Sequence, residues 1–332
     1  MGRTKADEYR NGPIWNWARE TWIGDWVRAC KRFRHELWSW ARSTQISSPS
    51  VDQLARSLEA LKVLQSSNPK EETEAPIFLL STGWRAGSTL FQRILVTDPR
   101  LLLWGEPLGE MTIFSGLAEM LSNCISPRNL QLWNEQQDPS SRALSTSWVA
   151  NLYPPSNDLR LGLKRLFDQW LREPARQLGF TRWGLKEVRL GATEAHLLHW
   201  LYPNAKFLSI SRHPYDSYRS LADSGWGQVY HKYPSVAVES AASFARHWNK
   251  LAVSWRQLPA GFPVVHIKYE DLIGGKVDFR ELETWLGIKI TENVALSAEV
   301  GGTARRAQLS WFERLIIRRE AGDGMRAIGY SE

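Results

Sequence analysis

Five short apolar segments recur along the chain from residue 77 onward, and amphipathic segments separate them. The apolar segments read IFLLS (77–81), LLLWGE (101–106), WGLKEV (183–188), KFLSISR (206–212) and PVVHIKY (263–269). Apolar strands that alternate with helices are typical of a parallel sheet whose two faces are both covered by helices. The pattern therefore predicts an α/β fold with a parallel central sheet and helices on both faces.

The first forty residues have a helical pattern of a different kind, which is rich in tryptophan. Apolar residues at steps of three and four form one stripe: Trp15, Ala18, Trp22, Trp26, Ala29, Phe33, Leu37 and Trp40. Basic residues lie mostly off this stripe, as in helices that rest on membrane surfaces. Two interpretations follow, a helix docked on the protein's own core or a peripheral contact with a membrane or a partner.

A second helix is predicted to begin after Ser50, where Gln53 completes a capping-box pattern. Its apolar face consists of Val51, Leu54, Leu58 and Leu61. Together these patterns divide the chain into a Trp-rich helical extension (1–65), a polar linker (66–76) and a main domain (77–332). Within the main domain, the polar region 124–155 is predicted to form an insertion or a lid.

The charge of the chain points to an anionic partner. Its 332 residues carry a formal net charge of +7, which suits nucleic acid, an anionic membrane surface or a phosphorylated cofactor. The basic residues are scattered, and no nucleic-acid-binding motif is present. We therefore expect no nucleic acid partner.

Cysteine usage and hydropathy indicate a cytoplasmic protein. The two cysteines, Cys30 and Cys124, form no disulfide framework and no metal-ligand pair, so we predict a reducing compartment and no metal. The first residues lack the apolar run of a signal peptide, and no stretch reaches the roughly 18 apolar residues of a membrane span. A cytoplasmic location is expected, with peripheral membrane attachment left open.

The segment after the first predicted strand has the composition of an anion-binding loop. It reads Gly83, Trp84, Arg85, Ala86, Gly87, Ser88 and Thr89. Glycines allow a tight turn in which backbone N–H groups and a helix N-terminus bind an anion. Nucleotide-hydrolysing P-loops place a lysine in this turn and a metal-holding aspartate on a second strand. Here the loop carries Arg85, and Arg212 follows the second strand, which indicates an anion clamp rather than metal-assisted phosphoryl transfer.

Two segments resemble the nucleotide-binding motifs of the sulfotransferases that use 3′-phosphoadenosine 5′-phosphosulfate (PAPS). LLSTGWRAGSTLFQRIL (79–95) is similar to the family's 5′-phosphosulfate loop, and FLSISRHPYDSYRSL (207–221) is similar to its 3′-phosphate motif. HIKYEDLIGG (266–275) and AGDGMRAIGY (321–330) resemble further segments of the family. The resemblance spans about residues 77–330 and leaves out the Trp-rich extension. It departs from the family pattern at Trp84, where proline is common.

The resemblance implies a P-loop-like sulfotransferase fold and gives roles to particular residues. The loop residues 83–89 would bind the 5′-phosphosulfate of PAPS, and Arg212 with Ser220 would bind its 3′-phosphate. Arg85 would also contact the transferring sulfonate, and Lys186 would reach the bridging oxygen of the leaving phosphate. Side-chain cations would replace magnesium, because a sulfuryl group carries less negative charge than a terminal phosphoryl group.

The acceptor hydroxyl needs a base near neutral pH. One branch of the family uses a histidine two residues after the strand-end lysine, but this chain has Val188 there. Another branch uses a glutamate at the end of the strand after the loop helix, and Glu106 matches it. Glu106 is therefore the predicted base, with Glu187 in reserve. We also predict that the strand bearing Glu106 lies directly beside the strand at 77–81.

Aromatic residues near predicted loop ends bear on the identity of the acceptor. Trp84, Trp104, Trp226 and Tyr230 lie near predicted loop ends and would suit the C–H faces of a sugar, although such residues equally serve in a core. We expect a carbohydrate hydroxyl, with a phenolic or tyrosyl group and a lipid-linked alcohol as alternatives. Two other classes stay open, a small-molecule kinase and a non-catalytic nucleotide-binding module.

Overall fold

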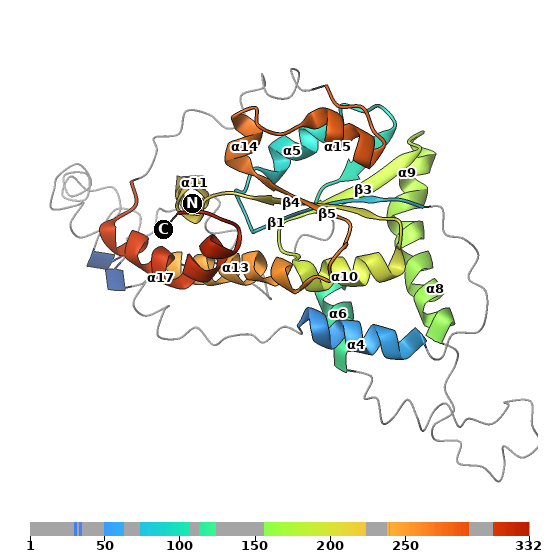
Figure 1. Ribbon diagram of the computed structural model, residues 1–332, viewed down its shortest axis with the longest axis horizontal. Coiled ribbons are helices and arrows are strands. Elements are labelled where there is room, and N and C mark those ends of the chain that lie inside the picture. Colours follow the sequence, from blue (N-terminus) through green and yellow to red (C-terminus); the bar gives the residue numbers. More distant parts are fainter. Residues whose placement is uncertain are drawn as a thin grey trace, which may run out of the picture.

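A computed structural model describes residues 30–31, 33–34, 50–62, 74–106, 113–123, 156–223, 238, 240–291 and 308–331. Its centre is a five-stranded sheet of β1 (Ile77–Ser81), β2 (Leu101–Trp104), β3 (Arg182–Glu187), β4 (Lys206–Ser211) and β5 (Val264–Lys268). All four strand pairs are parallel (Figure 1). The five predicted strands and the parallel sheet are confirmed.

Helices cover both faces of the sheet (Figure 1). One face carries α5 (Ser88–Leu95), α14 (Tyr269–Ile273) and α15 (Phe279–Leu286), and the opposite face carries α10 (Ala192–Leu201), α13 (Ala241–Ser254) and α17 (Trp311–Ala327). The other helices in the described part of the chain are α4 (Val51–Lys62), α6 (Ile113–Asn123), α8 (Ser156–Phe167), α9 (Glu173–Gln177) and α11 (Pro214–Asp223). A π-helical turn at Asp168–Arg172 joins α8 to α9, and a 3₁₀ turn at Trp255–Gln257 follows α13.

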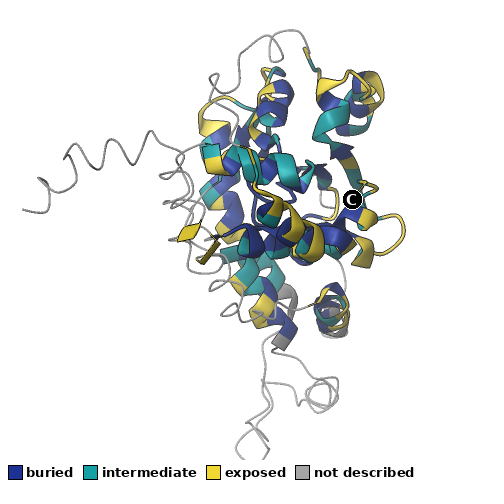
Figure 2. Cartoon of the chain, turned by 90° about the vertical axis from the view of Figure 1, so that its left-hand side faces the viewer, coloured by how far each residue is buried: buried dark blue, intermediate teal, exposed yellow. Residues whose placement is uncertain are grey.

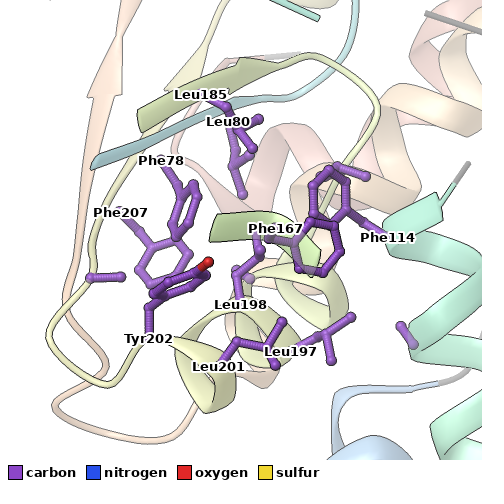
Figure 3. Packing of buried hydrophobic residues seen from close by; sticks show 14 of the residues in the cluster. Phe78, Leu80, Phe114, Phe167, Leu185, Leu197, Leu198, Leu201, Tyr202 and Phe207 are labelled. Atoms are coloured by element: carbon purple, nitrogen blue, oxygen red, sulfur yellow. The ribbon is translucent and has the colours of Figure 1, made fainter. Parts of the chain in front are cut away.

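The apolar residues of β1 divide between the two faces, as strand geometry requires. Ile77 and Leu79 pack with α5 and α15, whereas Phe78 and Leu80 pack with α10. Around Phe78 the rings of Phe207 and Tyr202 lie 5.3 Å and 6.1 Å away, centroid to centroid (Figure 3). Buried residues accordingly fill the interior between the sheet and its helical layers (Figure 2).

The strand order is β2-β3-β1-β4-β5, so β2 does not lie beside β1. The prediction that these two strands are neighbours is therefore wrong. The crossover through α5 sets the handedness of the connection from β1 to β2, but it does not require the two strands to be neighbours. It leaves one strand position between them, which β3 fills later in the chain. As a result the carboxyl end of β2 lies beside that of β3, which places the segments bearing Glu106 and Lys186 next to each other.

Helix α4 packs on the main domain although it precedes the predicted linker. Its apolar residues Val51, Leu54 and Leu58 belong to the same buried cluster as Phe78. The Ser50 half of the predicted capping box is present, because the Gln53 backbone N–H donates to Ser50 Oγ at 3.1 Å, while the Gln53 side chain donates from Nε2 to the Ser122 carbonyl at 3.4 Å. The proposed domain boundaries remain a prediction.

Few residues of the Trp-rich extension before α4 lie in the described part of the chain. Residues 1–29 and 35–49 lie outside it, as do most of the linker and the region 124–155, which was predicted to be an insertion or a lid. Phe33, one member of the tryptophan stripe, contacts Phe312 of α17 with ring centroids 4.5 Å apart. No helix among the described residues is long and apolar enough to cross a membrane.

Candidate active site

The loop between β1 and α5 has the backbone of an anion-binding turn. Gly83 and Gly87 adopt φ values of 111° and 90°, and Arg85 has φ 64°, the one positive value of a non-glycine residue in the described chain. Left-handed residues at such intervals form concave groups of backbone N–H donors. Helix α5 begins at Ser88, directly after Gly87, so its N-terminus faces the same turn. The predicted loop thus has the geometry to bind a phosphate or sulfate group.

Two predicted phosphate ligands meet at this loop from another part of the chain. Arg85 donates from Nε to Ser220 Oγ at 3.1 Å, and Arg212 donates from Nη1 to the carbonyl of Arg85 at 3.3 Å. Arg212 follows β4 and Ser220 lies in α11, more than a hundred residues beyond the loop. The fold therefore brings Arg85, Arg212 and Ser220 together.

Tyr269 connects the loop with Arg212. The guanidinium carbon of Arg212 lies 4.5 Å from the centroid of the Tyr269 ring, a cation–π distance. On the loop side, a Cβ atom on Gly87 would lie 2.2 Å from Cδ2 of Tyr269. Glycine at position 87 is thus required both by its left-handed backbone and by the close approach of this ring.

The other loop residues differ in exposure. Ser88 and Ala86 are buried and Thr89 is exposed. Trp84 is only 2% exposed and packs against His247, with ring centroids 5.1 Å apart. Its indole therefore belongs to the core, and only its backbone is available to a nucleotide.

The predicted base and the predicted leaving-group cation form an ion pair. Lys186, near the end of β3, donates from Nζ to Oε1 of Glu106, which follows β2. The Lys186 side chain is 7% exposed, whereas that of Glu106 is 27% exposed. The carboxylate is therefore held at the carboxyl edge of the sheet, where open α/β folds bind ligands, and it remains accessible from solvent.

Glu187, the reserve candidate, is engaged elsewhere. Its carboxylate forms a buried ion pair with Arg189 at 2.5 Å and accepts the backbone N–H groups of Val188 and Arg189 at 2.8 Å and 3.2 Å. Because neighbouring strand residues point to opposite faces, Glu187 lies on the other side of β3 from Lys186. This arrangement gives Glu187 a structural role and favours Glu106 as the base.

A polar cluster that the sequence did not reveal supports the end of β4. Glu270 accepts the backbone N–H of His213 at 3.0 Å and the hydroxyl of Tyr330 at 2.7 Å. Burial, with a contribution from Glu270, raises the pKa of Tyr330 well above its usual value, so the phenol stays protonated and donates. Glu270 lies in the segment HIKYEDLIGG (266–275), which resembles a segment of the family, but nothing in the sequence paired it with Tyr330.

The described residues contain no group of three or more His, Cys, Asp or Glu side chains that could hold a metal ion. The cations of the site are instead Arg85, Lys186 and Arg212. Such cationic side chains and backbone N–H dipoles are suited to stabilise negative charge on a bound group.

Comparison with known proteins identifies the family of this chain. The sequence profile of the sulfotransferase family matches residues 76–292. The fold is similar to the "Sulfotransferase Domain from the Curacin Biosynthetic Pathway" (15% identity, TM-score 0.44, covering 79% of this chain and 99% of that chain). It is also similar to a sulfotransferase from Alicyclobacillus acidocaldarius (15% identity, TM-score 0.42, covering 78% and 98%). No curated protein matches the sequence. Because the family profile covers well over half of the sequence, the chain belongs to the sulfotransferase family.

Proposed function

We propose that this chain transfers a sulfuryl group from PAPS to an acceptor hydroxyl. The observation that carries the proposal is the meeting of Arg85, Arg212 and Ser220 at one glycine loop. Two guanidinium groups, one from the loop and one from the end of β4, suit a nucleotide that carries anionic groups at both its 5′ and 3′ positions. PAPS has this distribution of charge, whereas ATP carries no 3′-phosphate.

The proposed reaction is an in-line displacement at sulfur. The acceptor oxygen forms a bond to sulfur while the bond from sulfur to the 5′-phosphate oxygen breaks, and 3′-phosphoadenosine 5′-phosphate (PAP) leaves. Glu106 accepts the hydroxyl proton, and Lys186 donates a hydrogen bond to the leaving oxygen. Such catalysis depends on positioning and charge stabilisation, and the protein forms no covalent intermediate.

The ion pair between Lys186 and Glu106 gives this scheme an order of events. While the pair is closed, Lys186 Nζ is bound to Oε1 of the proposed base. The phosphosulfate supplies a competing anion for Lys186, so donor binding would draw the ammonium away and leave the carboxylate to face the acceptor. Binding of the donor would in this way prepare the base.

For the acceptor we propose a saccharide hydroxyl. Two of the four aromatic residues that suggested this acceptor are engaged within the protein. Trp84 is buried, and Trp104 donates its indole N–H to the Leu171 carbonyl at 2.9 Å. Trp226 and Tyr230 lie outside the described residues. The test is a screen with labelled PAPS against saccharides, phenols, tyrosyl peptides and lipid-linked alcohols, with ATP as a separate donor. Transfer from ATP alone would refute the proposal.

Replacement of the base provides the test of mechanism. Glu106→Gln retains the shape and removes the basicity, so we expect turnover to fall by roughly two to four orders of magnitude while PAP affinity is retained. Steady-state rates and calorimetric affinities measure the two effects. Glu119→Gln, which changes an exposed acid of α6, is the matched control and should behave as wild type. Near-normal turnover of Glu106→Gln would move the base role to another residue.

A further inference from the structure

Tyr330 lies beside the backbone that presents Arg212, although it follows α17 and stands far from that residue in sequence. Its hydroxyl donates to Oε2 of Glu270 at 2.7 Å and lies 3.4 Å from Oγ of Ser211. Ser211 is the residue before Arg212. The phenol therefore touches the strand end that bears the predicted 3′-phosphate ligand.

The backbone around Arg212 is fixed from two further directions. The N–H of His213, the residue after Arg212, donates to Oε1 of Glu270 at 3.0 Å. The carbonyl of Arg212 accepts the indole N–H of Trp248 at 3.2 Å. One carboxylate thus holds both the peptide after Arg212 and the hydroxyl of Tyr330, so the tyrosine and the arginine are mechanically linked through Glu270.

The segment that carries Tyr330 is itself anchored. Lys268 donates to the Gly329 carbonyl at 2.7 Å and places its ammonium 4.8 Å from the centroid of the Tyr330 ring. The Tyr330 backbone N–H donates to the Met325 carbonyl at 2.8 Å. A hydroxyl on a segment held in this way can hold Glu270 in one orientation.

We propose that Tyr330 is a positioning residue for the 3′-phosphate site: through Glu270 it fixes the peptide that presents Arg212, and it thereby sets the preference for nucleotides phosphorylated at the 3′ position. The inference rests on the proposed function, because it takes Arg212 as the ligand of that phosphate. Tyr330 does not need to touch the nucleotide. Its effect comes from the ordering of Arg212 before the phosphate arrives.

The link from Tyr330 through Glu270 to Arg212 predicts that loss of the Tyr330 hydroxyl weakens the binding of nucleotides that carry a 3′-phosphate. Without the phenol hydroxyl, Glu270 keeps the His213 N–H but loses the donor that fixes its other oxygen, and Arg212 must then be ordered on binding. We expect Tyr330→Phe to weaken PAP binding about three- to tenfold, the net range of one hydrogen bond. Adenosine 5′-phosphate lacks the 3′-phosphate, so its affinity should change less than about twofold.

The experiment is a double-mutant cycle on the full chain, with dissociation constants for PAP and adenosine 5′-phosphate measured by calorimetry. The proteins are wild type, Tyr330→Phe, Arg212→Ala and the double variant. If Tyr330 acts through Arg212, the double variant should bind PAP no more weakly than Arg212→Ala alone. Additive losses, or equal losses for both nucleotides, would overturn the inference.

Tyr202→Phe is the matched control. The Tyr202 hydroxyl also donates to a carboxylate, Oδ1 of Asp168 at 2.9 Å, but Tyr202 lies in the core cluster that contains Phe78. Its removal should lower the thermal midpoint and leave the ratio of the two affinities unchanged. If Tyr330→Phe fails to fold, Glu270→Gln tests the same link and should reduce the same ratio. If wild type bound PAP and adenosine 5′-phosphate equally, the proposed donor would be refuted. This result differs from those that would overturn the role of Tyr330, so the experiment distinguishes the two.

Discussion

At the scale of single residues, His247 shows how a buried side chain supports the anion-binding loop. Its ring packs on Trp84, and a Cβ atom on Gly83 would lie 3.6 Å from its Cδ2. Nε2 has no hydrogen-bond partner among the described residues. Burial, aided by the nearby cations of Lys250 and Arg189, lowers the pKa of His247 from 6.5 to about 3. The imidazole is therefore neutral in the folded protein at neutral pH.

This neutral histidine predicts a loss of stability in acid. Between pH 6.5 and about 3 the unfolded chain binds a proton at His247 that the folded chain does not. The free energy of unfolding should therefore fall with decreasing pH, by up to about 1.4 kcal/mol per pH unit from this residue. Urea unfolding of wild type and His247→Gln from pH 7 to pH 4 measures the effect. Other buried histidines contribute to both proteins, so the variant should show a shallower slope, and equal slopes would contradict the assignment.

At the scale of elements, strand β3, which lies between β2 and β1, depends on a glycine that lets β1 approach. Gly184 pairs with Ile77 of β1 and Leu103 of β2. A Cβ atom at position 184 would lie 1.9 Å from the Ile77 carbonyl oxygen, so Gly184→Ala must displace a strand. We expect a loss of at least about 1–3 kcal/mol in the free energy of unfolding, measured in urea.

The matched control for this strand lies in α8. Gly162 is exposed on that helix, and a Cβ atom there would meet nothing within 4 Å. Gly162→Ala should therefore stabilise the protein by up to about 1 kcal/mol, because alanine favours the helix. If Gly184→Ala also stabilised the protein, the close approach of β1 and β3 would be refuted.

The strands could be predicted from the sequence because a sheet that is covered on both faces needs apolar residues at nearly every position. Their order could not, because the crossover from β1 to β2 passes over a position that β3 fills more than seventy residues later. The residues of the site likewise divide into those that the sequence predicts and those that depend on the fold. The loop and Arg212 follow from local patterns, whereas the choice between Glu106 and Glu187 depends on the partners that the fold gives each carboxylate, Lys186 and Arg189.

At the scale of the whole molecule, parts of the chain outside the family match complete the domain. The match ends at residue 292, yet α17 packs along α13 and shares a buried cluster with Trp84 of the loop and with Trp248. Before the match, α4 joins the cluster that contains Phe78. The support for the candidate site therefore extends over elements from both ends of the described chain.

The Trp-rich extension supplies the last prediction. The described contacts of Arg85, Arg212 and Glu106 all lie between residues 77 and 331. In the part of the extension before α4, Phe33 contacts Phe312 of the domain. Deletion of residues 1–42 should therefore leave PAP affinity within about twofold of wild type, as measured by calorimetry. Phe312→Ser in the full chain removes the same contact without a deletion and should likewise retain the affinity. If both proteins lose nucleotide binding or become insoluble, the tryptophan stripe belongs to the core, and its interpretation as a peripheral membrane or partner contact is excluded.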